Sequence, residues 1–224
     1  MPHPLAHVRT WIFDLDNTLY PAATNLFALI DARMGAFIAD RLQLDAAAAH
    51  AVQKAFFHAH GTTLRGLMTD HGVDPHEFLN DVHDIDVGGV SHAPELVAAI
   101  AALPGRKLIF TNADAVYAGR VLGQLGLEGA FEAIYDVHAM DYWPKPDARA
   151  YSGLCAKYGI DPATALFVDD MARNLAPAKA IGMTTVWIDN GSEQGPDDVP
   201  AGIDHRVTDV EAWLTGVVAE LETA

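Results

Sequence analysis

The chain alternates between short apolar runs and helical patterns, and this alternation restricts its fold more than any other feature. Runs rich in β-branched and aromatic residues predict strands at 8–15, 107–110, 165–168 and 184–188, with a weaker one at 133–136. Apolar residues recur with a helical period at 93–103, 115–125, 147–158, 172–181 and 210–221. Strands and helices that alternate in this way predict an α/β fold, in which a parallel sheet carries helices on both faces.

One interval of roughly 70 residues interrupts the alternation, because no strand pattern is found between about residues 22 and 92. Its apolar residues instead predict four successive helices, which lie near Leu26, after Asp45, near Leu64 and after Pro75. Such an interval is too long for an ordinary connection between two strands. We therefore predict an all-helical cap domain at 22–92, inserted into a core domain of residues 1–21 and 93–224.

The composition limits the partners of the chain. Its 224 residues, half of them hydrophobic, suffice for a large core, and 14 basic against 30 acidic residues give a net charge of −16. So acidic a surface disfavours nucleic-acid polymers and anionic membranes, which need basic patches. A small anionic substrate stays compatible with it if lysine, arginine or a metal ion supplies positive charge locally. Without an apolar signal-peptide core or an apolar run of about 18 residues, we expect a soluble cytoplasmic protein.

Two predicted strands end in polar side chains that suit phosphate chemistry. Asp14 and Asp16 lie at the end of the first strand, and a carboxylate is a usable nucleophile when a metal neutralises the phosphate that it attacks. Thr111 and Asn112 end the second strand, where a hydroxyl and a loop N–H could hydrogen-bond a phosphoryl oxygen. Each segment has an ordinary alternative, an aspartate turn for the first and a helix cap or turn for the second.

Two further segments add charge. Lys145 stands between Pro144 and Pro146, whose rings restrict the backbone, so its ammonium is suited to neutralise a nucleophilic carboxylate and a bound phosphate. Asp169 and Asp170 end a buried strand, and carboxylates are the hard oxygen ligands that Mg²⁺ prefers. The alternatives are a solvated loop lysine and a cap for the next helix. Because the carboxyl ends of parallel strands meet at one edge of a sheet, we expect all four segments to form one site.

The order of these motifs resembles a known family. In chain order they are Asp14-x-Asp16-x-Thr18, Thr111, Lys145 and Asp169-Asp170. Over nearly the whole chain this order is similar to the haloacid dehalogenase (HAD) superfamily, whose cap-bearing members carry a helical insertion between the first two motifs. The resemblance implies a Rossmann-like core of the HAD type. Three segments look like the pyrimidine 5′-nucleotidase branch of that superfamily: 13–20, 61–67 and 168–174.

The resemblance implies a role for each matching acidic residue. Asp14 would be the nucleophile and a metal ligand, and Asp16 the acid–base residue with its backbone carbonyl on the metal. Asp170 would bind Mg²⁺ directly, and Asp169 directly or through water. Asn174 stands where some relatives carry another acidic residue, and we do not count it as a ligand. Dehalogenases of the superfamily use no metal and lack the second aspartate of the first motif, so Asp16 favours phosphoryl transfer.

The resemblance also assigns phosphate binding to Thr111 and Asn112, and both charge balance and phosphate binding to Lys145. Since these motifs recognise only phosphate and metal, discrimination between substrates must come from the cap that covers the site. We predict that Arg65 in the cap and Tyr20 after the first motif contact the substrate. For Arg65, an arginine on a helix surface is the alternative.

These observations predict a Mg²⁺-dependent phosphomonoester hydrolase that forms an aspartyl phosphate and acts on pyrimidine nucleoside 5′-monophosphates. A sugar-phosphate or phosphoglycolate phosphatase, or a phosphomutase, is the alternative on the same machinery. A catalytically silent binding protein is disfavoured, because it would not need Asp14, Asp16, Lys145 and Asp170 together. The predicted partner is a small phosphorylated substrate, and the predicted assembly is a monomer or a homodimer.

Overall fold

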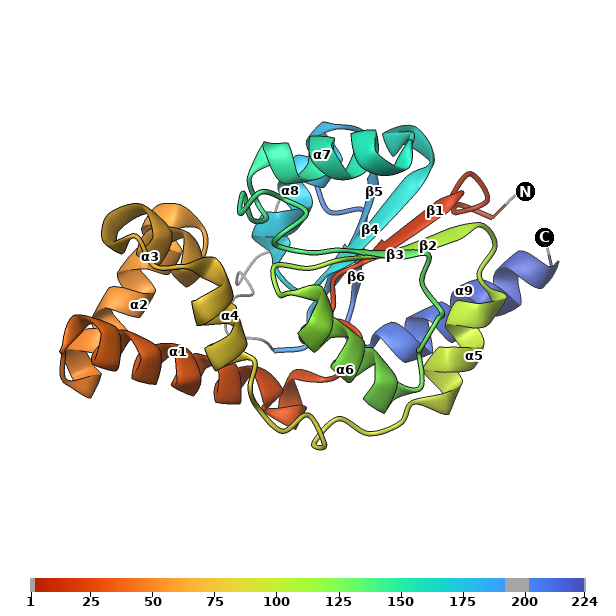
Figure 1. Cartoon of the computed structure of the whole chain (residues 1–224). Coiled ribbons are helices and arrows are strands. Elements are labelled where there is room, and N and C mark those ends of the chain that lie inside the picture. The colour runs from red at the N-terminus through yellow and green to blue at the C-terminus, as the bar shows by residue number, and fades with distance from the viewer. Residues whose placement is uncertain (1–2, 192–201, 224) are drawn as a thin grey trace.

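A single parallel sheet organises the computed structural model, which describes residues 3–191 and 202–223. Within these residues the sheet has six strands in the order β3-β2-β1-β4-β5-β6 (Figure 1). Their bounds are β1 Thr10–Phe13, β2 Arg106–Phe110, β3 Ala133–Tyr135, β4 Ala165–Asp169, β5 Thr184–Ile188 and β6 His205–Val207. The five predicted strands are present, although β1 is shorter than 8–15. Strand β6 was not predicted, because its three residues include a histidine and an arginine and form no apolar run.

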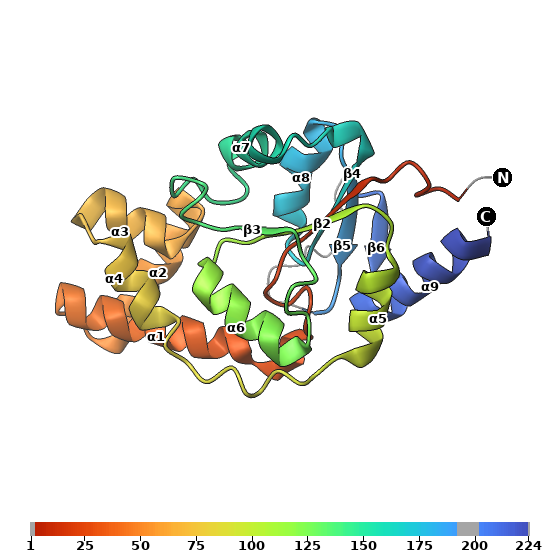
Figure 2. The same ribbon diagram turned by 45° about the vertical axis from the view of Figure 1, so that its right-hand side comes forward.

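Helices cover both faces of the sheet, as its apolar strands require. One face carries α7 (Ala148–Tyr158) and α8 (Ala172–Ala180). The other carries α5 (Pro94–Ala102), α6 (Ala115–Leu125) and α9 (Val210–Thr223) (Figures 1 and 2). Every residue of β1 and of β4 is buried, as expected for strands covered on both sides. In the described part of the chain, no helix has the length and apolar character needed to cross a bilayer.

Four helices between β1 and β2 form a separate group beside the sheet (Figures 1 and 2). They are α1 (Leu26–Leu42), α2 (Ala46–His60), α3 (Thr63–His71) and α4 (Pro75–Val82). Side-chain oxygens of Asp45, Thr62 and Asp74 accept hydrogen bonds from the first backbone N–H groups of α2, α3 and α4. Gly72 ends α3 at a φ of 63°, a conformation that glycine adopts without strain. The predicted α/β fold with an inserted all-helical cap is confirmed, while the domain bounds at 22–92 stay a prediction.

The register of the sheet sets the position of the acidic residues. In β1, Phe13 pairs with Ile109 of β2 and with Val168 of β4. The backbone N–H of Asp14 then donates to the carbonyl oxygen of Val168 at 2.9 Å. Asp14 therefore leaves the sheet beside Asp169, the last residue of β4.

Candidate active site

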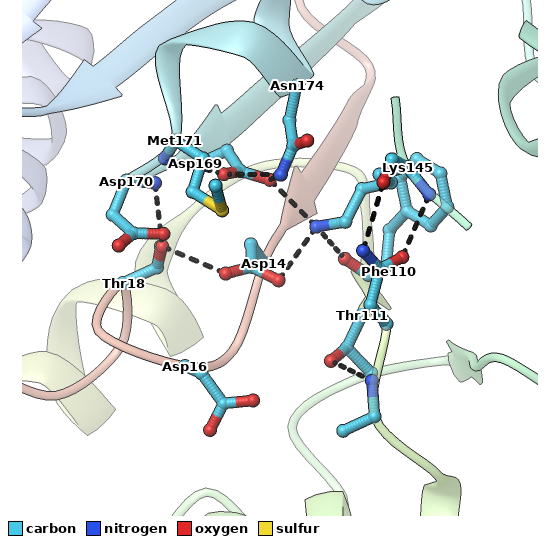
Figure 3. Close-up of polar contacts among 12 residues, drawn as sticks. Asp14, Asp16, Thr18, Phe110, Thr111, Lys145, Asp169, Asp170, Met171 and Asn174 are labelled. Atoms are coloured by element: carbon cyan, nitrogen blue, oxygen red, sulfur yellow. Dashed lines mark hydrogen bonds and ion pairs between the residues drawn. The ribbon is translucent and has the colours of Figure 1, made fainter. Parts of the chain in front are cut away.

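A buried lysine joins two of the predicted aspartates. Lys145 Nζ lies 2.7 Å from Asp14 Oδ1, 2.7 Å from Asp169 Oδ2 and 2.8 Å from the carbonyl oxygen of Phe110 (Figure 3). An ammonium has three N–H donors, so all three are engaged here. The lysine is 1% exposed, and Asp169 is fully buried. The four predicted segments therefore do converge on one edge of the sheet.

The cluster contains more negative than positive charge. Burial is the main reason that the pKa of Asp14 is raised to about 7; Asp169 and Asp16 raise it further, and Lys145 acts against them. Burial alone would lower the pKa of Lys145, but the carboxylates of Asp14 and Asp169 outweigh this and raise it. One carboxylate oxygen each of Asp14, Asp169 and Asp170 lies within 4.8 Å of the others. Hard oxygen donors at this spacing fit a divalent cation such as Mg²⁺, which would offset the excess charge.

Asp169 is held from several sides. Its Oδ1 accepts hydrogen bonds from the Met171 N–H at 2.8 Å and from Asn174 Nδ2 at 3.0 Å. Its Oδ2 accepts from Lys145 and also from Asn174 Nδ2 at 3.1 Å. From the sequence we do not count Asn174 as a metal ligand. In the structure its side-chain amide donates to Asp169 and orients that carboxylate.

Thr18, at the end of the first motif, ties the loop after β1 to the loop after β4. Its Oγ1 donates to Asp14 Oδ2 at 3.3 Å and accepts from the Asp170 N–H at 3.1 Å (Figure 3). Asp170 is nearly buried, at 4% exposure. The threonine therefore fixes the spacing between the two acidic segments.

Thr111 and Asn112 directly follow β2 and lie next to Lys145. Thr111 is buried, and its Oγ1 accepts a hydrogen bond from the Ala113 N–H at 3.0 Å. The amide of Asn112 is bound at both ends to the lysine backbone: Oδ1 accepts from the Lys145 N–H at 2.9 Å, and Nδ2 donates to the Lys145 carbonyl at 3.1 Å. The side chain of Asn112 therefore holds the lysine loop, which differs from its predicted role on the phosphate.

Asp16 lies apart from the lysine-centred cluster (Figure 3). Its Oδ1 accepts hydrogen bonds from two phenol hydroxyls, Tyr20 at 2.6 Å and Tyr117 at 2.7 Å. Burial, with the charge of Asp16, raises the pKa of both tyrosines, so both stay protonated donors. Tyr20 is buried, contacts Asp16 and does not line the described part of the cavity, whereas the sequence predicted that it contacts the substrate. Tyr117 was missed, since a tyrosine in α6 carries no local signal for this role.

A cavity of about 510 Å³ lies between the cap and the edge of the sheet that holds these residues. Its polar floor comes from the core and includes Asp14, Asp16, Thr111, Asn112, Lys145 and Asp170. Its walls come largely from the cap and include Ile30, Met34, Gln53, Phe57, Leu64 and Phe78. A mostly apolar enclosure with a few convergent polar groups is typical of a small-molecule site.

The segments that resemble the pyrimidine 5′-nucleotidases contain two arginines, Arg65 and Arg173, which lie in different places. Arg65 does not line the described part of the cavity; its guanidinium stacks 3.7 Å above the ring of Trp143 and donates to the Tyr142 carbonyl at 3.4 Å. Arg173 does line the cavity, donates to the Gly61 carbonyl at 3.1 Å, and makes no ion pair with a described carboxylate. Its Nε is buried without a hydrogen-bond partner in the described residues. Sequence reasoning placed the cavity arginine in the cap, whereas α8 supplies it.

Comparisons with known proteins identify the family. Residues 8–182 match the model of the haloacid dehalogenase-like hydrolases. Phosphate metabolism protein 8 of Saccharomyces cerevisiae is 24% identical over 199 residues, which cover 82% of this chain and 62% of that protein. Enolase-phosphatase E1 of Shewanella frigidimarina is 27% identical over 128 residues, which cover 55% of this chain and 51% of that protein. The match thus spans less than two thirds of the length of either relative.

Solved structures with the same fold include phosphatases and dehalogenases. A HAD phosphatase from Thermococcus onnurineus has a TM-score of 0.62 at 16% identity, with 95% of this chain and 99% of that chain covered. An L-2-haloacid dehalogenase from Xanthobacter autotrophicus has a TM-score of 0.61 at 16% identity, with 94% and 98% covered. At this identity the likeness concerns the fold alone, whereas the family model covers most of the chain. The chain therefore belongs to the haloacid dehalogenase-like hydrolase family.

Proposed function

We propose that this chain is a Mg²⁺-dependent phosphatase in which Asp14 attacks the phosphorus of a small phosphate monoester. The observation that carries the proposal is the buried pairing of Asp14 with Lys145 at 2.7 Å, beside Asp169 and Asp170, on the floor of the cavity between cap and core. A nucleophile, a fixed cation and further carboxylates at one point are what phosphoryl transfer to a carboxylate requires.

Asp14, Asp170 and the backbone carbonyl of Asp16 would hold the metal. Each side-chain oxygen of Asp169 already accepts two hydrogen bonds, against one for each oxygen of Asp14, so we propose that Asp169 contacts the metal through water. When bound, Mg²⁺ would neutralise the carboxylates and the phosphoryl oxygens, which lowers the cost of bringing them together.

The residues then divide the reaction into two halves. A carboxylate oxygen of Asp14 forms a bond to phosphorus while the bond to the ester oxygen breaks, and Asp16 gives a proton to that leaving oxygen. Thr111 holds a phosphoryl oxygen during the transfer, and the positive charge of Lys145 offsets the negative charge of the transferring group. In the second half, Asp16 takes a proton from a water molecule that attacks the same phosphorus. This step releases inorganic phosphate and restores the carboxylate of Asp14.

For the substrate we propose a nucleoside 5′-monophosphate with a pyrimidine base. The resemblance of three segments to pyrimidine 5′-nucleotidases supports this class. The cavity volume of about 510 Å³ also lies within the usual range for sites of small molecules. Arg173 lines the cavity and forms no ion pair with a carboxylate among the described residues, so we assign to it the contact with the substrate that was first expected of Arg65.

A phosphate-release screen tests the function. The panel contains pyrimidine and purine nucleoside 5′-monophosphates, sugar phosphates, phosphoglycolate and an aryl phosphate, each with Mg²⁺ and with a chelator. We expect release with Mg²⁺ alone, fastest from the pyrimidine nucleotides. Release of halide from a 2-haloacid without Mg²⁺, and no phosphate from any ester, would contradict the proposal.

Mg²⁺ should stabilise the folded chain. At 100 times its Kd the ion should add about 2.7 kcal/mol to the free energy of unfolding, measured by denaturant titration with Mg²⁺ and with a chelator. In the folded chain the pKa of Asp14 is raised from 3.8 to about 7. Without metal, the contribution of Asp14 to the free energy of unfolding is therefore fully present at low pH, where Asp14 is protonated, and is lost as the pH rises to 7. The gain from Mg²⁺ should therefore be smaller at pH 5 than at pH 8, because a proton on Asp14 competes with the ion. Equal unfolding midpoints with and without Mg²⁺ would argue against a metal site here.

Arg173→Gln should lower kcat/KM for a nucleotide about 10-fold or more, and lower it much less for a small aryl phosphate. The reason is that loss of a polar contact costs on the order of 1–3 kcal/mol when it leaves a buried group unpaired. Arg65→Gln is the matched variant outside the cavity, and it should leave the ratio between the two substrates unchanged. Steady-state kinetics on both esters measure the ratio. If Arg65→Gln changes this ratio and Arg173→Gln does not, the arginine that contacts the substrate is Arg65 in the cap.

A further inference from the structure

We propose that Tyr20 and Tyr117 are positioning residues that clamp one carboxylate oxygen of Asp16 and so aim its other oxygen at the leaving group. The inference deepens the proposed phosphatase function and rests on it, since it concerns the residue that moves the proton. Tyr20 follows the first motif by two residues, whereas Tyr117 lies about 100 positions further along in α6. Only the fold brings the two hydroxyls together.

Both hydroxyls meet the same oxygen. Tyr20 donates to Asp16 Oδ1 at 2.6 Å and Tyr117 donates to it at 2.7 Å. The two tyrosines are buried, at 2% and 1% exposure. Asp16 itself is partly exposed and lines the cavity. Short hydrogen bonds from buried donors to a carboxylate are stronger than neutral ones, so the orientation of the carboxylate is well defined.

The clamp decides which oxygen carries the proton. An oxygen that accepts two O–H donors has its lone pairs engaged, so a proton on Asp16 belongs on Oδ2. During cleavage this proton passes from Oδ2 to the ester oxygen as its bond to phosphorus breaks, and Asp16 becomes a carboxylate. The two hydroxyls then stabilise the charge that forms. When Asp16 later takes a proton from the attacking water, the same oxygen receives it.

Tyr117 is held in turn by the segment that follows the cap. Its ring stacks on His83 with the ring centres 4.5 Å apart and the planes 14° from parallel. His83 Nδ1 lies 2.5 Å from Asp114 Oδ2, and the other oxygen of Asp114 accepts the Tyr117 N–H at 2.8 Å. Arg120 donates to the His83 carbonyl at 2.8 Å. Because His83 directly follows α4, the last cap helix, the tyrosine is fixed by the segment that links cap and core.

A purely structural role for the tyrosines would depend on their rings. A phenylalanine keeps the ring and removes only the hydroxyl, so Tyr20→Phe and Tyr117→Phe separate the two roles. An aryl phosphate has a good leaving group that needs no proton, whereas the alkyl oxygen of a nucleotide does. Loss of the clamp should therefore slow the first half of the reaction for the nucleotide and leave it nearly unchanged for the aryl ester. The second half, hydrolysis of the aspartyl phosphate, is common to both esters.

The test compares the single-turnover rate of leaving-group release from the best nucleotide with that from an aryl phosphate in both phenylalanine variants, because this rate reports the first half of the reaction alone. We expect the nucleotide rate to fall about 10- to 100-fold and the aryl rate to stay within about threefold, with the concentration needed for half-maximal rate little changed. Tyr135→Phe, a buried tyrosine at the end of β3, is the control and should alter neither rate. In an Asp16→Asn background, Tyr117→Phe should cause no further loss on the nucleotide.

Equal losses on both esters, or a nucleotide rate like that of the parent chain, would overturn the clamp and leave the phosphatase function standing. A parent chain that releases phosphate from neither ester would overturn both. If one variant does not fold, the other tests the clamp alone, because each hydroxyl meets the same oxygen. Denaturant unfolding of every variant separates lost stability from lost chemistry.

Discussion

Asp14→Asn should release phosphate from every ester at least about 10⁴-fold more slowly than the parent chain, while the fold stays intact. An amide is nearly the same size as a carboxylate but cannot attack phosphorus. Asp14 is buried and its pKa is raised to about 7, so a neutral side chain is compatible with this position. Single-turnover phosphate release and denaturant unfolding give the two measurements.

The matched control for this variant is Asp141→Asn, which makes the same chemical change at an exposed residue. Asp141 has a φ of 50°, and asparagine tolerates this conformation well. The control should keep the activity and stability of the parent chain. An Asp14→Asn rate within about tenfold of the parent, equivalent to a barrier change of only ~1.4 kcal/mol, would remove Asp14 from the role of nucleophile.

Lys145→Met should lower the free energy of unfolding by about 3–5 kcal/mol in a chelator and abolish measurable turnover. The methionine fills similar space but leaves Asp14 and Asp169 buried without their cation, which is 2.7 Å from each in the parent chain. The pKa of Asp14, already raised, should rise further. Asp14 contributes to stability when it is protonated, and this contribution is lost as the pH rises. The loss in free energy of unfolding caused by Lys145→Met should therefore be smaller at about pH 5 than at about pH 8.

Lys179→Met is the matched control for the buried lysine. Lys179 also pairs with an aspartate, Asp204 at 2.7 Å, but both side chains are partly exposed. An exposed pair contributes at most about 1 kcal/mol, so this variant should change stability little. Similar losses for the two lysine variants would mean that the buried cluster has no special energetic role. Mg²⁺ should recover part of the loss in Lys145→Met, since a cation can replace the missing charge.

The α/β fold, the helical cap and the convergence of the acidic segments were predictable from the sequence. Apolar periodicity is a local property, and it separates strands from helices without knowledge of the tertiary structure. The site followed from one topological rule, because Asp14 and Asp169 each end a parallel strand and such ends meet. Strand β6 escaped this reasoning, since it is short and carries His205 and Arg206, and its pairing with β5 is seen only in the tertiary structure.

The tertiary structure alone decided which side chains meet across the site. Tyr20 and Tyr117 are about 100 residues apart yet share one oxygen of Asp16, and Arg65 turns to Trp143 while α8 supplies the cavity with Arg173. Such contacts depend on how the cap packs on the core and on the rotamers that this packing leaves open, and neither is encoded in a local pattern. The motifs thus predicted that the reacting groups lie at one edge of the sheet. Packing determined which side chains contact each group, because hydrogen bonds and electrostatic interactions depend on distance in space and not on distance in sequence.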